Sequence, residues 1–164
     1  MPKVVIDTVS LQHLLRPPKR SGKALPETAL DDHLLSGAIQ LALDRSRGLL
    51  SEWERTCGTE VIAVVINRWE RGIVFIATVK TLSPSVNKRL RQLGFKDPID
   101  RLVLRIACTC DKIAVSNDSD FWDPRDSRSL GNYNAPVARY MREELGVQVL
   151  LLAGLLNQLR KRSK

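Results

Sequence analysis

The stretch "DPIDRLVLRIACTCDKIAVSNDSDFWD", residues 97–123, contains the clearest helix start in the sequence and an apolar strand pattern that follows it. Asp97 suits a helix N-cap, Pro98 the first helical position and Asp100 the third, and all three are favoured there. The short apolar run at 112–115 then predicts a buried strand, and polar and acidic residues crowd its end. A helix that leads into a buried strand is the building unit of an α/β fold.

Further strands and helices alternate on both sides of this unit. Apolar and β-branched runs predict strands at 3–7, 38–43, 73–79, 112–115 and 147–152. Periodic apolar positions, caps and glycines predict helices at 10–15, 29–35, 49–57, 59–71, 84–93, 97–110, 136–145 and 155–161. A loop is expected at 16–27, while 38–43 also fits a helix and 59–71 also fits a strand. Because the strands are too apolar to leave a face in water, the sequence predicts a three-layer α/β/α sandwich with a central, mainly parallel sheet of about five strands.

The chain has 164 residues and is expected to form one domain, 1–159, with a basic tail at 160–164. Its net charge of +8 suits a polyanionic partner such as nucleic acid, because phosphates bound by Lys and Arg release counterions. No apolar run approaches the ~20 residues that a membrane span needs, so no membrane partner is expected. The first residues do not resemble a signal peptide, and three sparse cysteines fit reduced thiols, which together predict a cytoplasmic protein.

Acidic residues occur where parallel strands are expected to end. Asp7 directly follows the first strand, and Asp118 follows the strand at 112–115. Asp100 opens the helix that leads into that strand, and such a crossover helix begins at the carboxyl edge of the sheet. Glu52 is a fourth candidate, which the local pattern alone does not place. Carboxylates on one rim repel each other unless a cation lies between them, and Mg²⁺ or Mn²⁺ suits all-oxygen ligands.

Each of these acids also has a structural explanation that needs no metal. Asp100 can stabilise a helix N-terminus through the helix dipole, and Asp118 and Asp120 can be ordinary turn residues. Glu52 can lie on a solvated helix face beside a possible capping box, Ser51 to Glu54. A carboxylate directly after a buried strand needs a partner, so Asp7 is the hardest to explain in this way.

Five segments, in this order along the chain, resemble the PIN domain, a nuclease fold. They are "VVIDT" (4–8), "LALDRSRGLLSEWE" (41–54), "LGFKDPIDRLVLRIA" (93–107), "IAVSNDSDF" (113–121) and "LGVQVLLLAGLLNQL" (145–159). The resemblance implies that the acids of the site are Asp7, Glu52, Asp100 and Asp118, with Asp120 as an auxiliary acid. Two features depart from the family pattern: Ser116 stands where threonine is usual, and 16–44 matches poorly.

The resemblance implies a metal-dependent endoribonuclease that hydrolyses phosphodiester bonds of single-stranded RNA with one or two Mg²⁺ or Mn²⁺ ions. Asp7 and Asp118 would bind the metal directly, while the other acids would bind it or position water. The residues expected to orient these carboxylates are Thr8, Ser116 and Asn117. The basic residues expected to contact the RNA backbone are Arg45, Arg47, Lys88, Arg89, Arg125 and Arg128. Many relatives are toxins silenced by a small partner, so an antitoxin-like inhibitor and a homodimer are candidate partners.

Other functional classes fit the sequence less well. A haloacid-dehalogenase-like phosphatase would need a second Asp two residues after Asp7, where Val9 stands. Neither a P-loop nor a G-x-G-x-x-G stretch is present, and no helix-turn-helix with a basic recognition helix indicates a DNA-binding domain. The alternative is a catalytically silent PIN-like domain that binds nucleic acid or protein. Stabilisation by Mn²⁺ would indicate an occupied metal site and argue against a silent domain that lacks one.

Overall fold

The computed structural model describes residues 1–15, 38–59, 62, 63, 65, 67, 70–72 and 74–162. The predicted loop at 16–27 and the predicted helix at 29–35 lie outside these residues. In the predicted helix at 59–71, the described residues from 62 to 70 are helical. No helix in the described part of the chain combines the length and the apolar character needed to cross a bilayer.

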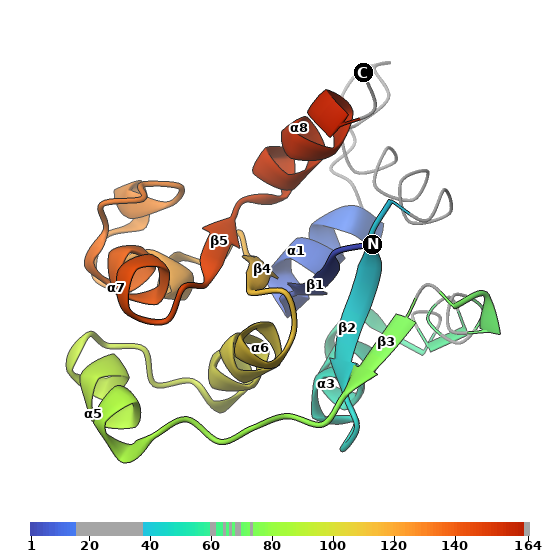
Figure 1. Ribbon diagram of the computed structural model, residues 1–164, viewed down its shortest axis with the longest axis horizontal. Coiled ribbons are helices and arrows are strands. Elements are labelled where there is room, and N and C mark those ends of the chain that lie inside the picture. Colours follow the sequence, from blue (N-terminus) through green and yellow to red (C-terminus); the bar gives the residue numbers. More distant parts are fainter. Residues whose placement is uncertain are drawn as a thin grey trace.

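Five parallel strands form one sheet through the centre of the molecule (Figure 1). They are β1 (Lys3–Ile6), β2 (Gln40–Asp44), β3 (Val74–Ala77), β4 (Ile113–Val115) and β5 (Gln148–Leu150). The strands lie in the order β3-β2-β1-β4-β5, and every neighbouring pair is parallel. Successive residues of β1 and β2 are buried, as expected for strands covered on both faces. The predicted α/β class and the five predicted strands are therefore confirmed.

Helices cover the sheet and complete a three-layer α/β/α sandwich. The described α-helices are α1 (Thr8–Leu15), α3 (Gly48–Cys57), α5 (Pro84–Gln92), α6 (Pro98–Thr109), α7 (Pro136–Glu144) and α8 (Leu152–Arg162). Two short 3-10 helices follow β4, namely η1 (Ser119–Phe121) and η2 (Ser127–Ser129). Helix α8 begins earlier than predicted and continues to Arg162, so the described part of the expected basic tail is helical.

A hydrophobic core joins residues from Val4 to Leu159. Its largest fully buried side chains include Trp53 of α3 and Trp122 after η1. The rings of Phe95 and Phe121 pack edge to face with centroids 5.1 Å apart, which is a favoured geometry for aromatic pairs. The segment before α6 is thereby packed against the segment after β4.

Helix α6 begins as the sequence predicts. The carboxylate of Asp97 accepts hydrogen bonds from the backbone N–H groups of Ile99 at 2.8 Å and Asp100 at 3.2 Å. These bonds satisfy donors that the first turn of a helix leaves unpaired. The cap therefore fixes Asp100 in the first turn of α6.

The start of α3 differs from the prediction. The capping box of Ser51 and Glu54 is wrong, because the helix already begins at Gly48. The carboxylate of Asp44, at the end of β2, instead accepts hydrogen bonds from the N–H groups of Gly48 at 2.7 Å and Leu49 at 2.9 Å. Burial opposes ionisation of Asp44, but these bonds and one from the Ser46 hydroxyl outweigh it and lower the pKa of its carboxyl.

Gly48 is needed for this close approach. A Cβ at position 48 would lie 2.8 Å from a methyl carbon of Leu102 and 3.3 Å from a carboxylate oxygen of Asp44. A side chain at this position would therefore crowd the Leu102 methyl group and the capping carboxylate of Asp44. The packing of α3 sets where Glu52 lies.

The strand order reverses direction at β1. Strand β2 lies on one side of β1 and β4 on the other, with Val4 opposite Ile113 and Ile6 opposite Val115. The backbone N–H of Asp7 extends this pairing by donating to the carbonyl of Val115 at 2.9 Å. Open parallel sheets bind ligands outside the carboxyl ends of strands at such a reversal. The side chains directly after β1 and β4 meet at this point.

Candidate functional site

A cavity of about 300 Å³ opens at the carboxyl ends of β1 and β4. Six of the side chains that line it are acidic, and we call it the acidic cavity. Its lining residues are Asp7, Thr8, Val9, Gln12, Glu52, Arg55, Thr56, Asp97, Ile99, Asp100, Asp118 and Asp120. The structure thus brings all five acids singled out in the sequence to one place, together with Asp97.

Asp7 is the most enclosed of these acids, with only 2% of its surface exposed. One carboxylate oxygen accepts a hydrogen bond from the backbone N–H of Ser10 at 2.7 Å, and the other accepts one from the hydroxyl of Ser116. Burial raises the pKa of Asp7, with a smaller contribution from the charge of Asp118, and the hydrogen bonds from the two serines oppose that rise. Asp7 is therefore rigidly held and costly to ionise.

Ser116 connects the ends of β1 and β4. Its hydroxyl donates to Asp7 and accepts a hydrogen bond from the backbone N–H of Asp118 at 3.0 Å. Ser116 therefore orients the carboxylate of Asp7 and the backbone of Asp118.

The other two residues expected to orient carboxylates have different roles. The side-chain oxygen of Asn117 accepts a hydrogen bond from the backbone N–H of Leu152 at 2.9 Å, at the start of α8. Its backbone N–H donates to the Ser10 hydroxyl at 2.8 Å, so it supports the site indirectly. The buried hydroxyl of Thr8 has no hydrogen-bond partner among the described residues.

Asp100 is both buried and surrounded by other acids. Burial, followed by the charges of nearby acids, of which Asp118 contributes most, raises the pKa of Asp100 to about 8. Burial and the charge of Asp118 also raise the pKa of Asp120, and a side-chain hydrogen bond with Asp100 partly offsets that rise. No cation among the described residues pairs with these two acids, so a proton remains on Asp100 near neutral pH.

Glu52 has a cation beside it already. Its carboxylate accepts hydrogen bonds from the Arg55 guanidinium, the shortest at 2.7 Å, and from the Thr56 hydroxyl at 3.0 Å. Arg55 is the one cationic side chain among the described residues that line the acidic cavity. Glu52 would have to leave Arg55 before it could bind a metal ion.

The donor set of the acidic cavity suits a hard divalent cation. Carboxylate oxygens are the ligands that Mg²⁺ and Mn²⁺ prefer. A cation would also neutralise the acidic charges that, after burial, raise the pKa of Asp100. Within the described residues, no three His, Cys, Asp or Glu side chains already stand close enough together to hold a metal ion. The residues therefore fit such an ion in chemistry and location, and side-chain movement would have to complete its coordination.

The basic residues proposed from the sequence lie outside the acidic cavity. Arg45 and Arg47 line a separate cavity of about 470 Å³ beside Asp44. Arg125 pairs with Asp123 at 3.2 Å, and Arg128 pairs with Asp126 at 3.0 Å. The remaining two, Lys88 and Arg89, are exposed on α5. None of these six residues lines the acidic cavity, and their contact with RNA stays a prediction.

Sequence reasoning missed two charged residues of the acidic cavity. The sequence pattern identifies Asp97 only as a helix cap, although it precedes Asp100 by one helical turn and also lines the acidic cavity. Arg55 follows Glu52 by three positions, a spacing that places side chains together on a helix. That spacing was the available signal for the ion pair.

A comparison of the chain with protein-family models and with curated protein sequences gives no match. The class of the protein therefore has to be inferred from its fold, its acidic cavity and the resemblance of its sequence motifs.

Proposed function

We propose that the protein is a metal-dependent endoribonuclease of the PIN-like class, which hydrolyses phosphodiester bonds of single-stranded RNA with Mg²⁺ or Mn²⁺. The observation that carries the proposal is the convergence of six acids on one cavity at the strand-order reversal, where burial and then the charges of neighbouring acids raise the pKa of Asp100 to about 8. Clusters of this kind with strongly perturbed pKa values favour functional sites over structural ones. The five sequence segments that resemble PIN domains support the same class.

The carboxylates of such a site would have different roles in metal binding and proton transfer. A bound Mg²⁺ or Mn²⁺ would supply a Lewis acid that activates water and neutralises charge on the phosphate. Asp7 and Asp118 are the proposed direct ligands, because Asp7 is fixed by Ser10 and Ser116 and each of its oxygens retains a second lone pair. Asp100, with Asp120 beside it, can accept or return a proton near neutral pH.

A catalytically silent binding domain is the second candidate, and the pairing of Glu52 with Arg55 favours it. An arginine beside a site carboxylate supplies part of the positive charge that a metal ion would otherwise bring. The toxin role, the antitoxin-like inhibitor and the homodimer that the resemblance implies stay predictions.

The test is cleavage of labelled single-stranded RNA with and without Mn²⁺ by the wild type, Asp7→Asn and Asp118→Asn. We expect cleavage that requires the metal and falls by at least about 100-fold in both variants, as for the loss of a principal catalytic group. Asp126→Asn is the matched control, because Asp126 lies away from the acidic cavity and an asparagine keeps its turn cap. A labelled DNA of the same sequence shows whether the sugar matters.

Thermal unfolding with Mn²⁺ separates the two candidates. Stabilisation of the wild type but not of Asp118→Asn, without any cleavage, would overturn the nuclease and leave a metal-binding domain. If Mn²⁺ neither stabilises the wild type nor supports cleavage, the proposed metal site is wrong, and the result supports the silent binding domain.

A further inference from the structure

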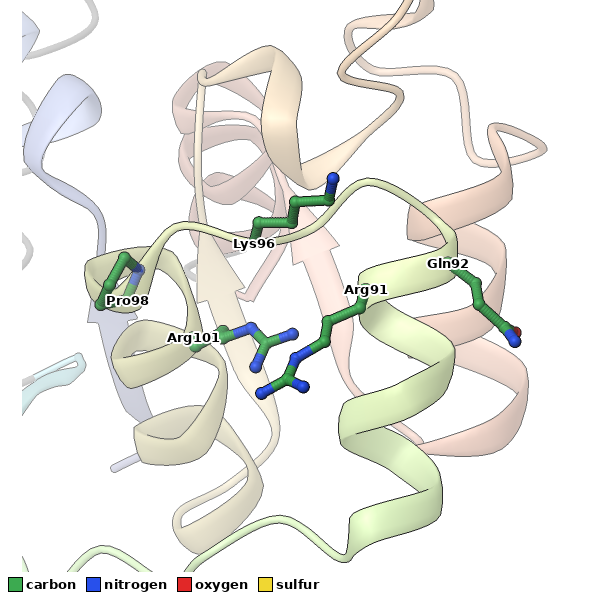
Figure 2. A pocket seen from close by; sticks show the side chains of 5 residues that line it. All are labelled: Arg91, Gln92, Lys96, Pro98 and Arg101. Carbon is green, nitrogen blue, oxygen red and sulfur yellow. The ribbon is translucent and has the colours of Figure 1, made fainter.

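A third cavity, of about 710 Å³, lies between α5 and α6. Its lining residues are Arg91, Gln92, Lys96, Pro98 and Arg101, and we call it the basic groove. Three of these five side chains are cationic, and no described acid lines the groove. Figure 2 shows the guanidinium groups of Arg91 and Arg101 approaching each other from the two helices, with Lys96 on the connecting segment.

The basic groove and the acidic cavity share one short segment of chain. Along residues 96–101, Lys96, Pro98 and Arg101 line the basic groove. The residues between them, Asp97, Ile99 and Asp100, line the acidic cavity. The two sites are therefore neighbours of opposite charge, and the cap of α6 fixes them relative to one another.

Arg101 is held in place by the protein. Its guanidinium donates to the carbonyl of Phe95 from two nitrogens, at 3.2 Å and 3.1 Å, and to the carbonyl of Asn87 at 3.4 Å. These neutral carbonyls leave its positive charge unpaired. Arg91 and Lys96 are exposed, and neither forms an ion pair with another described residue. Converging cations without an acid between them favour the binding of an anion.

We infer that the basic groove binds the phosphate backbone of a single-stranded polynucleotide whose next segment enters the acidic cavity. This inference rests on the proposed function for the path of the polynucleotide towards the acidic cavity. Binding of its phosphates rests on the groove alone. The guanidinium fork of Arg91 matches phosphate oxygens, and the fixed positive charge of Arg101 attracts them from beside it. The Gln92 amide offers a further donor, and Pro98 presents an apolar surface to a ribose or base. A phosphate chain fits this combination better than an acidic peptide, because it offers an anion and an apolar ring in each repeating unit.

The test is binding of a labelled oligouridine to the wild type and to Arg91→Glu/Lys96→Glu, followed by fluorescence anisotropy in EDTA. Without divalent cations, binding does not depend on the chemistry proposed for the acidic cavity. We expect the double variant to lose at least about 10-fold in affinity and about 1.4 units of the slope of log K against log salt, from two lost phosphate contacts. The matched control is Arg71→Glu/Lys161→Glu, which makes the same change in net charge at exposed positions outside the groove.

Equal losses in the two double variants would overturn the inference, because they would show general attraction to a basic protein. Unchanged binding by the groove variant would overturn it as well. If oligoglutamate bound as tightly as oligouridine and depended on the same two residues, the groove would be a site for an acidic protein. Should the charge reversal prevent folding, Arg91→Gln/Lys96→Gln gives the same comparison with a smaller perturbation.

Binding and cleavage can fail separately in this design. If RNA binds through the basic groove but is not cleaved in Mn²⁺, the nuclease proposal is wrong and RNA binding by the groove stands. If the protein cleaves RNA with metal but the groove variants bind RNA as tightly as the wild type, the nuclease proposal stands and RNA binding by the basic groove is wrong.

Discussion

Asp100 lies in the first turn of α6, where a carboxylate ordinarily gains stability from the helix dipole. Burial and the acids around it outweigh that gain and raise its pKa from 3.8 to about 8. Between these two values the folded protein keeps a proton on Asp100, whereas the unfolded chain has released it. The stability that depends on this group is therefore greatest below about pH 4 and decreases as the pH rises towards 8.

We therefore predict that Asp100→Asn stabilises the protein at about pH 8 and has little effect at about pH 4. The expected gain is on the order of 2 kcal/mol, less than the full shift implies because water partly screens the side chain. For a chain of this length the melting temperature should rise by about 4–8 °C. Urea unfolding across this pH range measures the effect.

Glu54→Gln is the control for this prediction, since Glu54 is exposed on α3 and outside the acidic cavity. Relative to the wild type, this variant should show no increase in stability against urea as the pH rises from about 4 to about 8. A gain of equal size at both ends of the pH range would show that Asp100 does not carry the proton.

Part of the site was predictable residue by residue. Asp7 and Asp118 follow apolar strands, and parallel strands bring their carboxyl ends to one edge, so the sequence pattern alone placed them together. Burial and pKa depend on side chains from several elements, which no local pattern contains. The pairing of Glu52 with Arg55, and the hydrogen bond from Ser116 to Asp7 across 109 residues of sequence, are contacts that this strand pattern does not predict.

At the scale of elements, the N-cap of α6 serves both sites. We predict that Asp97→Ala lowers the free energy of unfolding by about 1 kcal/mol, because the N–H groups of Ile99 and Asp100 lose their acceptor. Asp97→Asn should keep most of that stability, since an asparagine oxygen also caps. Chemical denaturation of the two variants checks the difference.

The same pair of variants separates capping from charge. Asp97 contributes to the raised pKa of Asp100, so both substitutions should lower that pKa, although only the alanine removes the cap. Equal stability of Asp97→Ala and the wild type would contradict the cap. An unchanged Asp100 titration in Asp97→Asn would contradict the electrostatic coupling.

The sequence predicts where the helices and strands lie better than it predicts what begins and ends them. Apolar runs located all five strands, and the cap-proline pattern located α6, because these signals are local. The predicted helix at 49–57 matches α3 to within one residue, but its capping box is wrong. Asp44, at the end of β2 and four residues before Gly48, caps the helix across a turn in which Arg47 is left-handed. The pattern from Ser51 to Glu54 matched a capping box by chance, one turn too late.

At the scale of the whole molecule, the described residues share a core that extends from β1 to α8. We predict that urea unfolds the protein in one cooperative transition, because no part of that core is independent of the rest. Far-UV circular dichroism and tryptophan fluorescence should give coincident curves. Trp53 and Trp122, both fully buried in different elements, are the probes.

The Trp69→Phe variant restricts the fluorescence signal to those two residues, since the chain has three tryptophans. Curves that separate would show that residues 1–159 contain two folding units, and the expectation of a single domain would be wrong.

The position of β1 in the sheet has a consequence for synthesis. The strand made first has β2 on one side, but its other neighbour, β4, begins only at Ile113. The Ser116 hydroxyl that holds Asp7, and the carboxylate of Asp118, come later still. At the usual rate of translation the ribosome needs on the order of ten seconds to add the residues between Asp7 and Asp118. A nascent chain on the ribosome, surrounded by RNA, therefore cannot assemble the acidic cavity until most of its length has been made.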